Sequence, residues 1–118
     1  MFIWLATGQI ERIGGHALAS LRNSENHCYL SVVSVVEVEL KMAIGKLDLP
    51  HNWETARSNN SCRWLGFSSK HGLALRKLPL IHRDPFDRML AAQALASDFT
   101  LVTADNKLLT YPIKTMRT

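Results

Sequence analysis

Acidic residues at three points in the chain could act together on a phosphate ester. Glu37 follows the apolar stretch at 28–34, Asp87 lies near the start of a predicted helix, and Asp105 follows the stretch FTLVT at 99–103. Carboxylates that converge repel one another unless they are protonated or bridged by cations. Hard divalent cations such as Mg²⁺ and Mn²⁺ prefer oxygen ligands and activate water for hydrolysis. These acids therefore favour the chemistry of a metal-dependent nuclease.

Each acid also has a purely structural explanation. Asp84, directly before a proline, is expected to be the N-cap of a helix rather than a metal ligand. Asp87 could equally be the capping-box partner of Asp84. Glu37 could form only a surface ion pair with Lys41, one helical turn later. Asp105 could bond to its own backbone in a turn. Both explanations stay open for these residues.

The elements that position these acids follow from the hydrophobic pattern. Short apolar, β-branched stretches predict strands, and stretches that follow capping residues predict helices. The expected strands are 28–34, 99–103 and 113–116. One helix is expected to start at Ser34, with Glu37 as its capping-box partner, and a second to cover 52–65. A third is expected from Ser68 or Ser69 through Arg76, and a fourth from Asp84 to about Ser97. Strands separated by helices imply a parallel sheet and an α/β fold. Ligands in such folds bind beyond the carboxyl ends of the strands, where the three acids are expected.

Composition and charge narrow the class of protein. The chain has 118 residues, so we expect one domain over residues 1–118. Its net charge of +4 favours polyanionic partners, nucleic acid first. Two cysteines, Cys28 and Cys62, are too few for a disulfide framework and point to a reducing, cytoplasmic setting. No apolar run approaches the roughly 20 residues of a membrane span, and no P-loop or GxGxxG pattern is present.

Three stretches resemble conserved blocks of one family. Residues 34–50, SVVEVELKMAIGKLDLP, resemble the second conserved block of PIN-domain proteins of the VapC toxin type. Residues 82–94, HRDPFDRMLAAQA, resemble the third block closely, and residues 101–105, LVTAD, resemble the fourth. The blocks fall in the family's order, and the resemblance extends from about Phe2 to Met116. It implies a PIN-like three-layer α/β/α fold with a parallel sheet flanked by helices.

The same resemblance implies a function and a set of site residues. Family members are Mg²⁺- or Mn²⁺-dependent ribonucleases, the toxin halves of bacterial type II toxin–antitoxin pairs, usually dimers that a cognate antitoxin wraps and inhibits. The matching residues in this chain are the metal-binding acids Glu37, Asp87 and Asp105 with the neighbouring acid Asp84, the pocket residues Ser34 and Thr103, and the basic residues Lys41 and Arg88, which could meet phosphate.

The amino-terminal end departs from the family pattern. Members begin with a short apolar strand that ends in an Asp-Thr-His-like motif, whose Asp is a principal metal ligand. Residues 2–5, FIWL, resemble the segment after that motif, so the first strand and the first acid are expected to be missing. A misassigned start codon is the favoured explanation; a decayed gene and a strand supplied by another chain are the alternatives. The codons upstream of Met1 distinguish them.

Two functions are compatible with this departure. The first is RNA cleavage by metal-activated water, with weak or absent activity expected for residues 1–118 because one ligand is missing. The second is a catalytically inactive remnant that only binds an antitoxin or a sister subunit. A metal titration separates the two, because a remnant gains little stability from metal.

Overall fold

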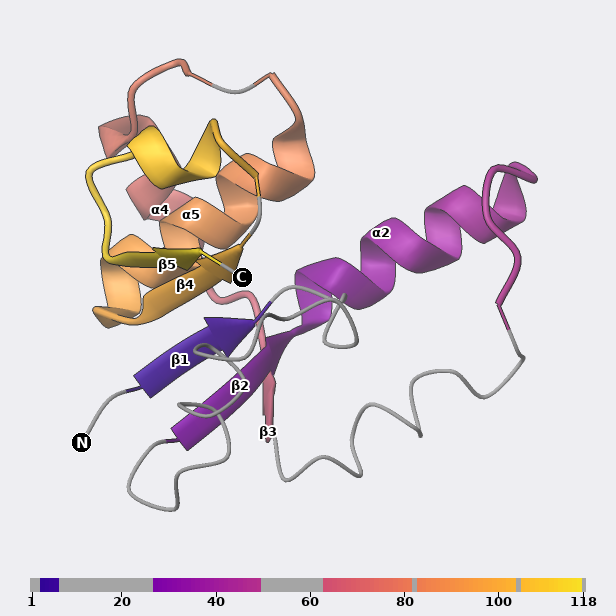
Figure 1. The fold of residues 1–118 in the computed structure, drawn as a ribbon, viewed down its shortest axis with the longest axis horizontal. Coiled ribbons are helices and arrows are strands. Elements are labelled where there is room, and N and C mark those ends of the chain that lie inside the picture. The colour runs from indigo at the N-terminus through magenta and orange to yellow at the C-terminus, as the bar shows by residue number, and fades with distance from the viewer. Residues whose placement is uncertain (1–2, 7–26, 50–62, 82, 104, 118) are drawn as a thin grey trace.

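The computed structural model describes residues 3–6, 27–49, 63–81, 83–103 and 105–117 (Figure 1). The strands are β1 (Ile3–Ala6), β2 (His27–Ser31), β3 (Arg63–Leu65), β4 (Thr100–Thr103) and β5 (Thr115–Arg117). The helices are α2 (Val32–Ala43), α4 (Ser69–Ala74) and α5 (Pro85–Ser97), with 3₁₀ turns η2 (Leu75–Lys77) and η3 (Leu108–Thr110).

The five strands form one sheet in the order β3-β2-β1-β4-β5, and every neighbouring pair is parallel. Parallel neighbours cannot be joined by a tight turn, so the chain must cross over between them. The predicted α/β fold with a parallel sheet is confirmed. The carboxyl ends of all five strands meet at one edge, which we call the carboxyl edge.

The middle of the sheet corrects the expectation that the central strand is missing. Ile3–Ala6 forms β1, which pairs with β2 from Ile3 opposite His27 and with β4 from Trp4 opposite Thr100. Four residues suffice here because strands on both sides satisfy the backbone hydrogen-bonding groups. None of the four residues is acidic. The strand is therefore present, but residues 3–6 bring no carboxylate to the carboxyl edge.

The junction between β2 and α2 lies three residues earlier than expected. Ser31, not Ser34, is the N-cap: its hydroxyl accepts a hydrogen bond from the Val33 backbone N–H at 3.0 Å. Ser34 is instead buried within the first turn, so the expected capping box of Ser34 and Glu37 is wrong. Glu37 consequently lies in the second turn of α2.

Two other predicted boundaries also change. Residues 63–65 were expected at the end of a helix over 52–65, but they form β3, because the open edge of β2 offers them partners. The rest of that expected helix lies outside the described residues. The last strand is 115–117 rather than 113–116.

The capping signals in the second half of the chain are confirmed. Asp84 is the N-cap of α5, with Pro85 at the first helical position. Ser68 is the N-cap of α4, and its backbone N–H donates to Nδ1 of His71 at 3.0 Å. The strand predicted over 99–103 is β4.

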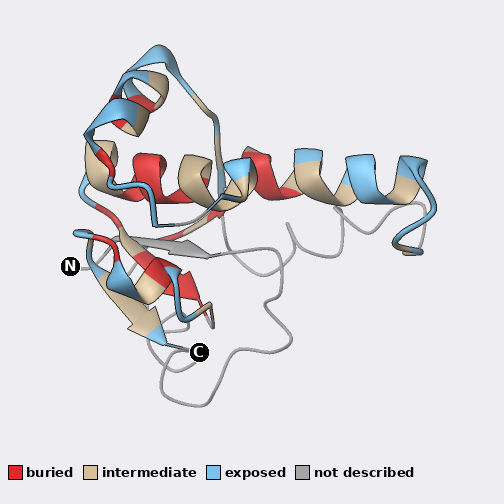
Figure 2. Cartoon of the chain, turned by 90° about the horizontal axis from the view of Figure 1, so that it is seen from above, coloured by how far each residue is buried: buried red, intermediate tan, exposed pale blue. Residues whose placement is uncertain are grey.

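The core lies between α5 and the sheet. Leu90, Ala91, Ala92 and Ala94 of α5 are buried, as is Leu101 of β4. Small alanine side chains let the backbone of α5 approach the sheet closely. In contrast, α2 points away from the other described helices, and its outer half is exposed (Figures 1 and 2).

Two further findings concern the cysteines and the membrane. Cys28 is disulfide-bonded, so the small number of cysteines no longer supports the inference of a reducing setting. No helix of the described part of the chain has the length and apolar character that crossing a membrane requires.

Arg88 joins the start of α5 to two neighbouring segments. Its guanidinium donates to the carbonyl oxygen of Pro79 at 2.8 Å and to that of Leu75 at 3.2 Å. A longer contact of 3.4 Å reaches the hydroxyl of Tyr111. The planar fork of an arginine serves several acceptors at once, which a lysine ammonium on a single stem does not reproduce. Arg88 thus holds the segment before α5 against the helix.

Replacing Arg88 should therefore destabilise the fold even when the charge is kept. We expect Arg88→Lys to lower the free energy of unfolding by about 1–3 kcal/mol, the cost of leaving carbonyls without a charged donor. Urea unfolding followed by circular dichroism measures this. The matched control is Arg83→Lys on an exposed residue of the same loop, which should change stability by less than about 0.5 kcal/mol. Equal effects of the two variants would contradict the structural role.

Candidate functional site

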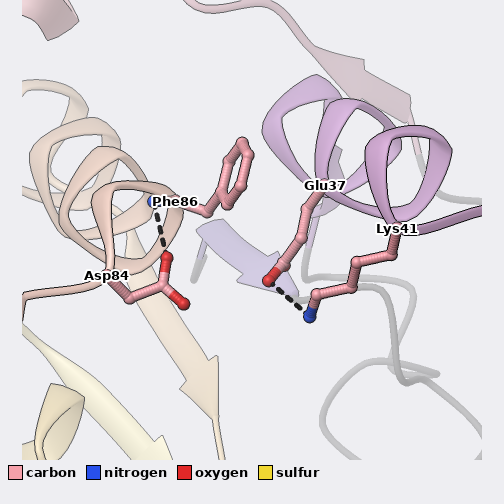
Figure 3. Close-up of polar contacts among 4 residues, drawn as sticks. All are labelled: Glu37, Lys41, Asp84 and Phe86. Carbon is pink, nitrogen blue, oxygen red and sulfur yellow. Dashed lines mark hydrogen bonds and ion pairs between the residues drawn. The ribbon is translucent and has the colours of Figure 1, made fainter. Parts of the chain in front are cut away.

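Acidic residues of two helices face each other at the carboxyl edge. Glu37 and Lys41 extend from α2 toward the start of α5, where Asp84 lies (Figure 3). The Lys41 Nζ atom lies 3.0 Å from Oε2 of Glu37, so the predicted ion pair within α2 is present. Convergence was predicted for Glu37, Asp87 and Asp105, and it stays a prediction; what the structure shows is that Glu37 extends toward Asp84 (Figure 3).

The positive charge of Lys41 interacts with the negative charges of this group of acids. The hydrogen bond that Lys41 donates to Glu37, together with the negative charge of Glu37, raises the pKa of the Lys41 ammonium above its ordinary value of 10.5. Burial lowers this pKa by less than Glu37 raises it, and the charges of Asp84 and Asp87 add smaller upward shifts. Three carboxylates from two helices therefore act on one ammonium. We call Glu37, Lys41, Asp84 and Asp87 the acidic face.

The two acids of α5 have different positions in its first turn. Asp84 accepts a hydrogen bond from the backbone N–H of Phe86 at 2.9 Å through Oδ1, as expected of an N-cap. Asp87 lies one residue beyond Phe86, half-buried, in the first turn of the helix. Negative side chains are stabilised there by the helix dipole. The cap leaves Oδ2 of Asp84 as the oxygen turned toward α2 (Figure 3).

The carboxylate of Asp105 accepts hydrogen bonds within the turn after β4. Its Oδ1 accepts from the backbone N–H of Lys107 at 2.8 Å and from that of Leu108 at 3.3 Å. Its own backbone N–H donates to Oγ1 of Thr103 at 3.0 Å. These bonds match the alternative explanation of Asp105 as a turn aspartate and tie Thr103, which is buried, to the same turn.

The remaining predicted site residues lie away from open solvent or are held by the backbone. Ser34 is buried in the first turn of α2, and Arg88 is bound to two carbonyl oxygens of the preceding segment. The carboxylate chemistry of the acidic face suits a hard divalent cation. Yet the described residues contain no group of three or more His, Cys, Asp or Glu side chains arranged to hold a metal ion. Glu37, Asp84, Asp87 and Asp105 therefore stay a predicted ligand set.

A buried polar bridge at this edge was missed in the sequence. The Ser31 hydroxyl donates to Oε1 of Gln93 at 2.5 Å, and Nε2 of Gln93 donates to the carbonyl oxygen of Gly66 at 3.2 Å. We call these three residues the Gln93 bridge. It joins the end of β2, the middle of α5 and the residue after β3. A glutamine among alanines and leucines on the inward face of a predicted helix was the available signal.

Comparisons with solved structures agree with this architecture. A VapBC2 complex from Rickettsia felis bound to a promoter DNA fragment contains a chain with a TM-score of 0.70 and 14% identity, with 99% of each chain covered. A DNA-bound VapBC complex from Salmonella typhimurium gives 0.70 and 14%, covering 99% of this chain and 98% of that one. FitAB bound to the IR36 DNA fragment gives 0.59 and 16%, covering 98% and 94%. These likenesses concern the fold.

The sequence itself provides the assignment to a family. No curated protein matches the chain. The family model for the PIN domain, however, matches residues 2–114. The matched residues include the acidic face and all the described helices and strands except β5. The chain therefore belongs to the PIN domain family.

Proposed function

We propose that the chain is the toxin component of a type II toxin–antitoxin system, a Mg²⁺- or Mn²⁺-dependent endoribonuclease. The observation that carries the proposal is the acidic face: Glu37 and Lys41 of α2 extend toward Asp84 (Figure 3), and the charges of Glu37, Asp84 and Asp87 all act on Lys41. The family and the complexes named VapBC and FitAB among the structural neighbours support it. The basic net charge of +4 suits a polyanionic substrate.

Individual residues of the chain would have separate roles in such a site. Glu37 and Asp87 would supply carboxylate oxygens from facing helices, and Asp84 would add its second oxygen while it caps α5. A bound divalent cation supplies activated water and neutralises charge on the phosphate. Lys41, half-exposed beside Glu37, would meet the phosphate backbone of RNA. Asp105 would order the turn after β4 and approach the same edge.

We also propose two protein partners. The first is a cognate antitoxin, since the structural neighbours belong to toxin–antitoxin complexes. The second is another copy of this chain in a homodimer. Both follow from the family and not from a contact in the structure, and a cytoplasmic location follows in the same way.

A catalytically inactive PIN protein is the competing function. It is favoured by the lack of a three-ligand metal group among the described residues and of an acid in residues 3–6. Such a protein would keep the fold and its partners without metal-dependent chemistry. Metal binding by this chain therefore decides between the two functions.

Asp87→Asn should remove the response to metal. For residues 1–118 we expect Mn²⁺ to raise the melting temperature of the wild type, equivalent to about 2.7 kcal/mol at a concentration 100 times Kd. Asp87→Asn should lose most of this shift because one ligand oxygen loses its charge. The control is Asp98→Asn at the other end of α5, whose left-handed backbone an asparagine accepts. Scanning calorimetry with and without Mn²⁺ measures both.

Cleavage is tested with the same pair of variants. In a chain that includes any in-frame residues upstream of Met1, Asp87→Asn should lower Mn²⁺-dependent RNA cleavage by at least about 100-fold while the circular dichroism spectrum is kept. Asp98→Asn should cleave like the wild type. Unchanged cleavage by Asp87→Asn would refute the site assignment, and a wild type that neither binds Mn²⁺ nor cleaves would establish the inactive alternative.

RNA binding should depend on salt through Lys41. Each phosphate contact adds about 0.7 to the slope of log affinity against log salt for single strands. Lys41→Gln should reduce this slope by about that amount. Lys114→Gln is the control, because Lys114 also pairs with an acid, Asp98 at 2.9 Å, but precedes β5 at the opposite edge of the sheet. Fluorescence anisotropy with a labelled oligoribonucleotide measures the slopes, and equal slopes for the two variants would exclude a phosphate contact by Lys41.

A further inference from the structure

Within the described part of the chain, the buried anchor of α2 is its first turn. Its buried residues are Val33 and Ser34, and the residues from Glu39 to Lys41 are exposed (Figure 2). A helix held at one end transmits any change of angle there to all later turns. Glu37 lies just beyond the attached turn, so its position depends on how that turn is held.

The Gln93 bridge holds this turn. Ser31 and Gln93 are both fully buried, and their contact at 2.5 Å links residues 62 positions apart in the sequence. The same Ser31 oxygen accepts the Val33 N–H at 3.0 Å, so Gln93 orients the hydroxyl that caps α2. Buried hydrogen bonds of this kind restrict geometry, because an unpaired polar group there is costly.

Gln93 lies on the same helix as the second half of the acidic face. Six residues separate it from Asp87, about 9 Å along the axis of α5. Its other contact, with the carbonyl oxygen of Gly66, fixes the side chain from the side of β3. Gln93 therefore has one connection to the start of α2, one to the sheet, and a rigid helical connection to Asp87.

We propose that Gln93 is a positioning residue that sets the spacing of Glu37 on α2 from Asp87 on α5. This inference rests on the proposed function for its purpose, since the spacing matters only if the two carboxylates share a ligand. It goes beyond that function by assigning the control of the site to a buried amide that touches neither carboxylate. Gln93 would thus act through the hydroxyl of Ser31 and the backbone of α2.

Two variants test the bridge. Gln93→Met keeps the length of the side chain and removes both of its hydrogen bonds, and Ser31→Ala removes the hydroxyl alone. Leu101→Val, a core change in β4 that removes no hydrogen bond of the Gln93 bridge, is the control for lost stability. All are compared with the wild type under conditions in which each protein is folded, with melting temperatures recorded.

The first readout needs no metal. Amide hydrogen exchange of α2 from Val36 to Ala43 should become about tenfold faster in Gln93→Met, the scale of one lost buried hydrogen bond, relative to the amides of α5. Ser31→Ala should act in the same direction, and the double variant should add little to it because the two residues form one unit. Leu101→Val should leave the ratio of α2 to α5 exchange unchanged. A wild-type ratio in Gln93→Met would overturn the proposal.

The second readout is the affinity for Mn²⁺ measured by calorimetry. Gln93→Met should bind about 10–100-fold more weakly than the wild type, as residues that orient metal ligands do, whereas Leu101→Val should bind normally. Faster exchange in α2 with unchanged Mn²⁺ affinity would overturn the positioning role and leave a structural one. If the wild type binds no Mn²⁺, the metal-dependent function fails, and the exchange ratio alone decides whether Gln93 positions α2.

Discussion

Parallel pairing determines where the other parts of this chain can lie. Since parallel neighbours need crossovers, all five strands end at the same edge of the sheet. Ser31 ends β2 and caps α2 at once, and Asp105 turns the chain into η3 shortly after β4. Helix starts carry unpaired N–H groups and a positive dipole end, which favour acidic side chains. The same constraint thus gathers both the caps and the acids.

The carboxylates of the acidic face repel one another, and the positive charge of Lys41 reduces this repulsion. Lys41 is four residues from Glu37 on one helix, so the formation of α2 places its positive charge beside the carboxylate of Glu37. A cation from solution would find carboxylates already partly neutralised. This arrangement keeps the face stable without a bound ion and makes any ion compete with an ammonium. Under the proposed function, metal affinity would depend on how α2 is held as well as on the number of carboxylates.

Local chemistry could be predicted from the sequence, and distant contacts could not. Asp84 before a proline identifies the start of α5 without knowledge of the fold. By contrast, Ser31 rather than Ser34 is the N-cap of α2, and the hydroxyl of Ser31 bonds to Gln93, 62 positions away in the sequence. Arg88 was expected near phosphate from the family resemblance, and its carbonyl partners could not be predicted because they depend on the folded path of the chain. Likewise, β1 and β3 are strands because neighbouring strands offer them partners, which four or three residues do not indicate by themselves.

The central place of β1 has a consequence for the newly made chain. This strand is synthesised before the other four described strands, but one of its two neighbours begins only at Thr100. Until that residue has left the ribosome, one side of β1 has no native partner and presents an open strand edge. Contacts between such distant segments form slowly and late. A nascent chain therefore carries the sequence of the acidic face well before it has the sheet that brings those acids together.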